Sequence, residues 1–311
     1  MTTFALPQTD LVVSRLAYGC MRIAGVWDPN AVTAEHEAAG RAALLAAYDS
    51  GYTLFDHADI YSQGACEKIH GNLLAESPSL RGQTILATKC GIRFPGDPNH
   101  DSPHRYDFRA EHIVWSCEQS LRRLQVETID IYQLHRPDYL MNPDEVADAF
   151  IRLKESGKVR WFGVSNFLPS KVEALQSRLR FPLTVNQVEI HLGRLACFED
   201  GTLDQCLTRR ITPLAWSPLG GGWLGAVREA PTNPPHLAAL VDLTDAMAEV
   251  YGVTRTEIAL RWLLAHPAGI VPIVGSTRPE AIRQAVYALD EPMGYEDWYR
   301  LLVAARGEGL P

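Results

Sequence analysis

Eight short apolar segments alternate with longer amphipathic segments along almost the whole chain. Most of the apolar segments are continuously hydrophobic rather than alternating, which is typical of parallel strands covered on both faces. The predicted strands span residues 15–19, 52–56, 84–89, 130–135, 159–165, 183–189, 211–217 and 270–276. Such a chain can form either a closed (β/α)8 barrel or an open doubly wound sheet.

The intervening segments carry recognisable helix signals. Gly51 follows the helix-like residues 33–50 and is a good C-terminal signal, and Pro143 opens another helix with acidic residues in its first turn. Three other predicted helices cover residues 107–125, 255–264 and 278–289, and a fourth begins at Pro169. Strands and helices therefore alternate as a barrel requires.

Two motifs expected of the open sheet do not occur. Residues 17–25 read AYGCMRIAG, which does not match the Gly-x-Gly-x-x-Gly turn that follows the first strand of a dinucleotide-binding sheet. The chain also has no Gly-x-x-x-x-Gly-Lys-Ser/Thr phosphate loop. We therefore predict one α/β domain, a TIM barrel over residues 1–311, with a short N-terminal hairpin covering its floor.

Charge and cysteine usage exclude several classes of protein. The formal net charge is -8, so the chain has no overall attraction to phosphate backbones, and nucleic-acid binding is not expected. None of the six cysteines forms a Cys-x-x-Cys pair, which favours reduced thiols in a cytosol. No secretory leader and no apolar run long enough for a bilayer is found, so we predict a cytoplasmic protein without a membrane partner.

Polar residues stand at the C-terminal ends of seven of the predicted strands. In a barrel these ends converge on one mouth, where the loops 91–108 and 217–235 would also lie. Each residue alone is more often a turn or cap residue, but the recurrence on successive strands indicates a site. The residues are Asp56, Lys89, His135, Ser165 with Asn166, Gln187, Trp216 with Ser217, and Ser276.

Three of these residues, together with Tyr61, suit carbonyl reduction. A hydride added to a carbonyl leaves an alkoxide, which needs a proton donor. Tyrosine is a weak acid, and a neighbouring ammonium such as Lys89 is expected to lower the pKa of Tyr61. Asp56 could hold Lys89 charged, while His135 hydrogen-bonds the carbonyl oxygen.

At this point the chain resembles the aldo-keto reductases, in particular a branch of bacterial oxidoreductases. The resemblance covers nearly the whole chain, in the family's order. It implies an NAD(P)H-dependent oxidoreductase acting on a small aldehyde or ketone, with Tyr61 as proton donor, Asp56 and Lys89 as its tuning pair, and His135 orienting the carbonyl. The matching segments are FDHADIYSQGACEKIHG, ATKCG, IDIYQLHRPD, GKVRWFGVSNF, TVNQVE, LAWSPLGGG and PIVGSTRPEAI.

The resemblance also implies the cofactor, NADPH, bound across the barrel mouth without a Rossmann fold. Trp216 stands where the family generally has a tyrosine that stacks on the nicotinamide. Ala281, Gln284 and Ala285 depart from the family pattern, which leaves the preference for NADPH over NADH open, with Arg278 or Arg283 as the candidate substitutes for the family's arginine. The implied cofactor residues are Ser165, Asn166 and Gln187 at the carboxamide, Trp216 on the ring, Ser217, Leu219, Gly220, Gly221 and Gly222 near the pyrophosphate, and Ser276, Thr277 and Arg278 at the 2′-phosphate.

Several alternatives stay open beside this interpretation. A barrel of this family can serve as a cofactor-binding regulatory subunit. All four residues of the implied catalytic tetrad are present, however, and favour an enzyme: Asp56, Tyr61, Lys89 and His135. Trp27 and His57 are candidate substrate contacts. The spacing of His100, His104 and His112 does not assemble a metal site, so no metal is expected. The resemblance makes a monomer the default.

Overall fold

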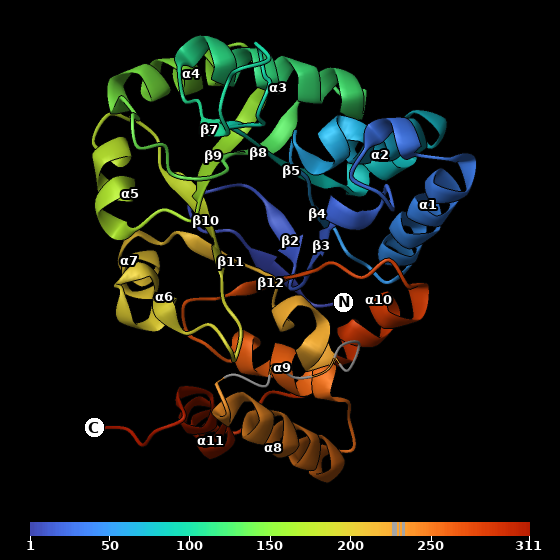
Figure 1. Ribbon diagram of the computed structural model, residues 1–311, viewed down its shortest axis with the longest axis vertical. Helices are drawn as coiled ribbons and strands as arrows, with labels where there is room; N and C mark the ends of the chain where they lie inside the picture. Colours follow the sequence, from blue (N-terminus) through green and yellow to red (C-terminus); the bar gives the residue numbers. More distant parts are fainter. Residues whose placement is uncertain (226–228, 230, 232–233) are drawn as a thin grey trace.

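A closed barrel of eight parallel strands forms the centre of the protein, as seen in a computed structural model that describes residues 1–225, 229, 231 and 234–311. The strands follow one another around the barrel in chain order (Figure 1). Each of the eight predicted strands corresponds to one of them, so the predicted TIM barrel is confirmed. Their bounds are β3 Ala17–Gly19, β4 Leu54–Asp56, β5 Ile85–Cys90, β8 Ile129–Leu134, β9 Val159–Ser165, β10 Leu183–Glu189, β11 Thr212–Trp216 and β12 Val271–Val274.

Helices surround the barrel on its outside (Figure 1). The amphipathic segments predicted as helices coincide with helices of the structure. The helices α2, α6, α7, α8 and α11 were not predicted. The α-helices are α1 Ala34–Asp49, α2 Ala65–Glu76, α3 Ala110–Leu124, α4 Pro143–Glu155, α5 Pro169–Gln176, α6 Ala196–Glu199, α7 Thr202–Arg209, α8 His236–Tyr251, α9 Arg255–Leu264, α10 Pro279–Ala285 and α11 Tyr295–Arg306.

Capping boxes fix the start of two of these helices, α1 and α9. Thr33 accepts a hydrogen bond from the backbone of His36 at the start of α1, and the His36 ring reaches back to the backbone of Thr33. Thr254 and Glu257 form the same capping box at the start of α9. Each box satisfies backbone N–H groups that have no partner inside the helix.

The predicted N-terminal hairpin is present and closes one end of the barrel. It consists of β1 Thr3–Ala5 and β2 Val12–Ser14, which pair antiparallel. Leu6, Leu11 and Val13 of this segment belong to the same buried cluster as Leu54 of β4 and side chains of the other barrel strands. The hairpin thus excludes water from the amino-terminal end of the barrel interior.

The opposite end carries the longer loops. Residues 91–108, predicted as a non-helical loop, contain a small antiparallel hairpin of β6 Ile92–Arg93 and β7 Arg105–Tyr106. The loop 217–235 begins with a 3-10 segment, Gly220–Gly225, and part of it lies outside the described residues. Within the part of the chain that the structure describes, no helix combines the length and apolar character needed to cross a membrane.

Candidate active site

The four residues predicted as a tetrad meet at one end of the barrel. Asp56 is the last residue of β4, Lys89 lies near the end of β5, and His135 directly follows β8. Tyr61 begins the 3-10 turn Tyr61–Gly64, five residues beyond Asp56. All four side chains are buried or nearly so, and the parallel strand ends bring them together as predicted.

The Lys89 ammonium connects the other groups. Its Nζ donates to Asp56 Oδ2 at 2.8 Å, to the backbone oxygen of His57 at 2.7 Å and to the Tyr61 hydroxyl oxygen at 3.2 Å. These three bonds use all three N–H donors of the ammonium. Gln187 Nε2 donates to the other carboxylate oxygen, Asp56 Oδ1, at 2.7 Å. Because every partner of this buried ion pair is fixed, the ammonium is held against the phenol.

Burial and charge act in opposite directions on these groups. Burial disfavours the Lys89 ammonium, but the charges and hydrogen bonds of Asp56 and Tyr61 outweigh it, so the pKa of Lys89 lies above its ordinary value. Burial raises the pKa of Tyr61 to about 12, although the Lys89 charge acts to lower it. The lowering effect expected from Lys89 is present, but burial outweighs it, so the pKa of Tyr61 lies above its ordinary value instead of below it.

His135 is neutral at physiological pH. Burial, and then the charges of Lys89 and Arg136, lower the pKa of its imidazole well below the ordinary range. Its ring lies edge-on to the Tyr61 ring, with 5.9 Å between the ring centroids. A neutral imidazole beside a protonated phenol gives two hydrogen-bond donors for one carbonyl oxygen.

The residues predicted to bind a carboxamide form a connected polar group. Asn166 Oδ1 accepts from Trp216 Nε1 at 2.9 Å, and Asn166 Nδ2 donates to Ser165 Oγ at 2.8 Å. Ser165 Oγ in turn donates to the backbone oxygen of Gln187 at 2.8 Å. Asn166 adopts a positive φ of 61°, a conformation that asparagine tolerates better than most residues. These bonds orient the amide and hydroxyl groups before any ligand arrives.

A cavity of about 590 Å³ joins this group to the candidate tetrad and to the residues after β12. Asp56, Tyr61 and His135 line it, and eleven of the twelve predicted cofactor residues do so as well. The exception is Gly220, which has a φ of +58° and lies so close to Trp223 that a side chain would collide with the indole. The eleven are Ser165, Asn166, Gln187, Trp216, Ser217, Leu219, Gly221, Gly222, Ser276, Thr277 and Arg278.

The two candidate substrate contacts have different surroundings. Trp27 lines the cavity and is 59% exposed, as a residue at its mouth would be. His57 is fully buried and does not line the cavity. Asp56 points into the barrel, so the next residue, His57, points outward towards α2, because side chains alternate along a strand. The prediction that His57 touches substrate is therefore corrected.

Two cationic residues of the cavity wall were missed in the sequence. Arg22 follows the first barrel strand, and Arg136 directly follows His135. The Arg136 guanidinium lies over the Trp216 ring, 5.3 Å from its centroid. No ion pair among the described residues involves either arginine. Their positions just beyond strand ends were a usable signal, because that is where a barrel places its site.

One group of potential metal ligands lies behind the tetrad. Cys20, His57 and His70 are buried, and one ligand atom from each lies within 4.8 Å of the others. Among the histidines, the sequence argument weighed His100, His104 and His112, which are close together in the chain; His112 lies in α3 and is buried. The buried group combines residues from three separate elements, so spacing could not reveal it.

The sequence matches a known family over most of its length. A model of the Aldo/keto reductase family matches residues 15–302. A 6-dehydroglucose reductase from Novosphingobium aromaticivorans is 41% identical over an alignment of 314 positions, which covers 98% of this chain and 96% of that protein. The resemblance noted in the sequence is thereby confirmed.

Solved structures agree with this match. A glycerol dehydrogenase from Gluconobacter oxydans has a TM-score of 0.86 at 27% identity, covering 99% of this chain and 97% of that one. An aldo/keto reductase from Klebsiella pneumoniae, solved in complex with NADP and acetate, has a TM-score of 0.73 at 26% identity, covering 93% and 90%.

Proposed function

The chain belongs to the aldo/keto reductase family, and from this premise we propose that it reduces a small aldehyde or ketone with NADPH, using Tyr61 as the proton donor. Membership of the family supports an oxidoreductase that uses a nicotinamide cofactor. The proposal treats residues 1–311 as one barrel unit, acting as a monomer. The observation that carries it is the Lys89 ammonium, which bridges Asp56 and Tyr61 at the inner end of the cavity.

The geometry suits Tyr61 for proton donation. Lys89 donates its N–H to the phenol oxygen, so the phenol's own proton is free to point towards the cavity. A pKa of about 12 keeps this proton on the phenol at neutral pH. As the proton leaves, the ammonium is already in place to stabilise the phenolate that forms.

His135 and Gln187 complete the proposed arrangement. The neutral His135 ring donates to the carbonyl oxygen and fixes the side from which Tyr61 approaches it. Gln187 holds the second oxygen of Asp56, so that the carboxylate keeps Lys89 charged and oriented. The reaction needs both effects, because a misplaced donor or an uncharged lysine would each raise the barrier.

The cavity lining fits an extended nicotinamide dinucleotide. When bound, the cofactor supplies the hydride. Ser165, Asn166 and Trp216 offer amide, hydroxyl and indole groups at one end, while Ser276 and Arg278 offer a hydroxyl and an exposed guanidinium at the other. A guanidinium suits the extra phosphate that distinguishes NADPH from NADH. We therefore assign Arg278 to the 2′-phosphate.

The substrate side of the cavity suits a polyhydroxylated carbonyl compound. The relative from Novosphingobium aromaticivorans is named for its action on 6-dehydroglucose. Arg22 and Arg136 form no ion pair among the described residues, so their N–H groups are available to hydroxyl oxygens. Trp27 offers an aromatic face, which packs well against the C–H groups of a sugar. We propose a sugar aldehyde as the first substrate to test.

The decisive experiment measures NADPH oxidation with a panel of sugar aldehydes, simple aldehydes, ketones and dicarbonyls. We expect Tyr61→Phe to lower turnover by about 10²- to 10⁴-fold, because only the proton donor is lost. The affinity for NADPH should stay within about twofold. Tyr132→Phe is the matched control, since it also removes a buried hydroxyl, one that bonds the backbone of Ile113 instead of the tetrad.

Two results would change the proposal. Undiminished turnover in Tyr61→Phe would remove Tyr61 from the chemistry. Tight NADPH binding without turnover of any compound would favour the alternative, a cofactor-binding regulatory subunit, and a search for a protein partner would follow.

A further inference from the structure

A chain of polar side chains leads away from the candidate tetrad on the side opposite the cavity. It starts at His57, whose backbone oxygen accepts from Lys89. His57 Nε2 lies 2.8 Å from His70 Nδ1, and His70 Nε2 lies 2.8 Å from the Tyr48 hydroxyl. Tyr48 continues to Thr84 Oγ1 at 2.7 Å. The two histidines are fully buried, which is unusual for polar rings that the proposed chemistry does not use.

The direction of each hydrogen bond follows from the far end of this chain. Thr84 donates its only hydroxyl proton to the backbone oxygen of Leu80 at 2.6 Å, so its oxygen must accept from Tyr48. Tyr48 has then used its only proton, and its oxygen accepts from His70 Nε2–H. Nδ1 of a neutral His70 therefore carries a lone pair and accepts from His57 Nε2–H. Both rings thus carry their proton on Nε2.

Both imidazoles are neutral. Burial, and then the Arg81 charge, lower the pKa of His70 to about 3. Burial, and then His70 and Lys89, lower the pKa of His57 well below the ordinary range. Neither ring changes its charge near neutral pH, so the direction of the chain is fixed.

The chain also fixes the peptide group that holds the lysine. The backbone N–H of His57 donates to the oxygen of Ala87 at 2.8 Å, and its ring is anchored by His70. With both ends of the residue restrained, its carbonyl points at Lys89 Nζ. That carbonyl accepts a hydrogen bond from one of the three ammonium N–H groups, which leaves the other two to donate to Asp56 and Tyr61.

We propose that His57 and His70 are positioning residues, which aim the Lys89 ammonium at the Tyr61 oxygen through the carbonyl of His57. The proposal rests on the proposed function, because it assumes that the contact between Lys89 and Tyr61 promotes proton transfer. Cys20 lies close enough to offer a third metal ligand. In the arrangement described, however, the lone pair of His70 Nδ1 accepts the hydrogen bond from His57 Nε2–H. The two histidines therefore form a hydrogen-bonded pair that restrains His57.

Two amide substitutions at His70 separate the roles of its two nitrogens. In His70→Asn the side-chain oxygen occupies roughly the position of Nδ1 and can still accept from His57. In His70→Gln the amide nitrogen occupies roughly the position of Nε2 and preserves only the bond to Tyr48. His70→Phe preserves the ring packing but neither bond; the ring centroid lies 5.0 Å from that of Phe55.

We expect His70→Phe and His70→Gln to lower kcat by about tenfold, because small displacements of a reacting group are costly. KM and the NADPH dissociation constant should change by less than about twofold. His70→Asn should recover kcat to within about threefold of the wild-type protein. Thermal unfolding of all three variants checks that the order of kcat does not follow the order of stability. Equal kcat in all three, or an order set by stability, would overturn the positioning role.

A second measurement needs no substrate. In protein labelled with 15N-histidine, NMR should show His57 and His70 protonated on Nε2 and unchanged between about pH 5.5 and 8. A proton on Nδ1 of either ring, or titration of either ring in this range, would overturn the proposal. So would a stoichiometric metal ion in the purified protein that is lost in Cys20→Ser.

The two measurements distinguish failure of the inference from failure of the proposed function. If the wild-type protein reduces a carbonyl and Tyr61→Phe does not, but His70→Phe matches the wild type, the positioning role alone is wrong. If no compound is reduced, the proposed function fails, and the NMR result still decides whether the hydrogen bond between His57 and His70 has the inferred direction.

Discussion

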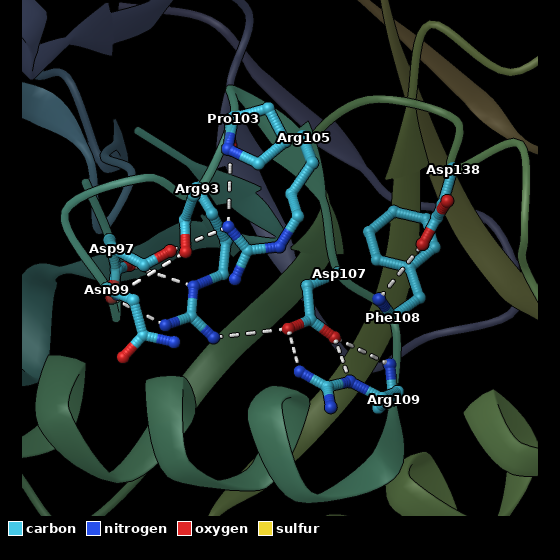
Figure 2. A network of polar contacts seen from close by, with 10 residues as sticks. Arg93, Asp97, Asn99, Pro103, Arg105, Asp107, Phe108, Arg109 and Asp138 are labelled. Atoms are coloured by element: carbon cyan, nitrogen blue, oxygen red, sulfur yellow. Dashed lines mark hydrogen bonds and ion pairs between the residues drawn. The ribbon is translucent and has the colours of Figure 1, made fainter. Parts of the chain in front are cut away.

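Two parts of the site are held by ion pairs of different kinds. We call the inner end of the cavity, with Asp56, Tyr61 and Lys89, its floor, and the loop 91–108 with the hairpin β6–β7 its rim. On the floor, Lys89 and Asp56 are buried, with side-chain exposures of 0% and 4%. At the rim, the hairpin β6–β7 is tied by arginines around Asp107 (Figure 2). Asp107 is 3% exposed, but its partner Arg109 is 67% exposed. The Arg109–Asp107 pair can therefore be screened by salt, whereas the floor pair cannot.

This difference indicates which part of the site tolerates change. Removing one partner of a buried ion pair leaves a charge without compensation, which costs several kcal/mol. Removing the charge of Asp107 at the rim leaves Arg109 in contact with water and Arg93 still paired with Asp97. The floor therefore fixes the reaction, while the rim can vary with the substrate.

Lys89→Met tests the floor and should give the largest effect. The substitution keeps an unbranched side chain, one atom shorter than lysine and without the charge, and leaves Asp56 buried with Gln187 as its remaining side-chain donor. We expect turnover to fall by about 10³-fold and the free energy of unfolding by about 3 to 5 kcal/mol. NADPH oxidation and urea denaturation measure the two effects separately.

The double variant Asp56→Asn/Lys89→Met is the matched control. It removes both charges, so stability should recover most of the loss while turnover does not. A single variant that keeps more than a tenth of the wild-type turnover would show that the floor pair is structural.

The sequence predicted the floor well because strand ends are set by local pattern. Eight apolar segments define eight strands, and the polar residues at the ends of seven of them then lie at the mouth. The same logic, applied with strand alternation, would also have placed His57 correctly: Leu54 belongs to the cluster inside the barrel and Phe55 to the cluster outside it. Asp56 then points inward and His57 outward.

The rim and the chain behind the floor could not be predicted in this way. The pairing of Arg93 with Asp107 depends on the register of the hairpin β6–β7, whose strands have two residues each and in which Ile92 lies opposite Tyr106. The contact between His57 and His70 depends on how α2 packs against β4. Both are properties of tertiary structure that leave no periodic signal in the sequence.

Arg278→Ala tests the outer end of the cavity and should have an intermediate effect. Losing a guanidinium that binds the 2′-phosphate should weaken NADPH binding by about tenfold to a hundredfold, the usual range for a hydrogen bond to a charged group. NADH lacks this phosphate, so its affinity should change by less than about twofold. Fluorescence titration with each cofactor measures the two dissociation constants.

Arg283→Ala provides the comparison, because Arg283 is exposed on α10, the helix that directly follows Arg278, but does not line the cavity. It should leave both affinities unchanged. Equal losses for NADPH and NADH in Arg278→Ala would move the phosphate site elsewhere.

Asp107→Asn tests the rim and should give the smallest effect. Burial opposes the charge of Asp107, but the hydrogen bonds of Arg109 and nearby positive charges outweigh it and lower the pKa of Asp107 to about 2. A carboxyl whose pKa is lowered by folding adds stability above the unfolded value of 3.8, and that stability is lost as the pH falls towards 2. At pH 7 we therefore expect the substitution to cost about 1 to 3 kcal/mol.

The rim differs from the floor in what this loss does to activity. Loosening the hairpin should raise KM for the carbonyl substrate by about twofold to fivefold and leave kcat almost unchanged. The hairpin residue Ile92 lines the cavity, but among the described residues the side-chain hydrogen bonds and ion pairs of Asp56, Tyr61 and Lys89 do not involve the hairpin. Thermal unfolding is measured at pH 7 and at pH 3, each at low salt and in 1 M NaCl. The difference in Tm between the variant and the wild type should become smaller at pH 3 and also smaller in 1 M NaCl. Asp97→Asn, at the more exposed end of the same network, should have a smaller effect on KM. A fall in kcat comparable with that of Lys89→Met would mean that the rim and the floor act as one unit.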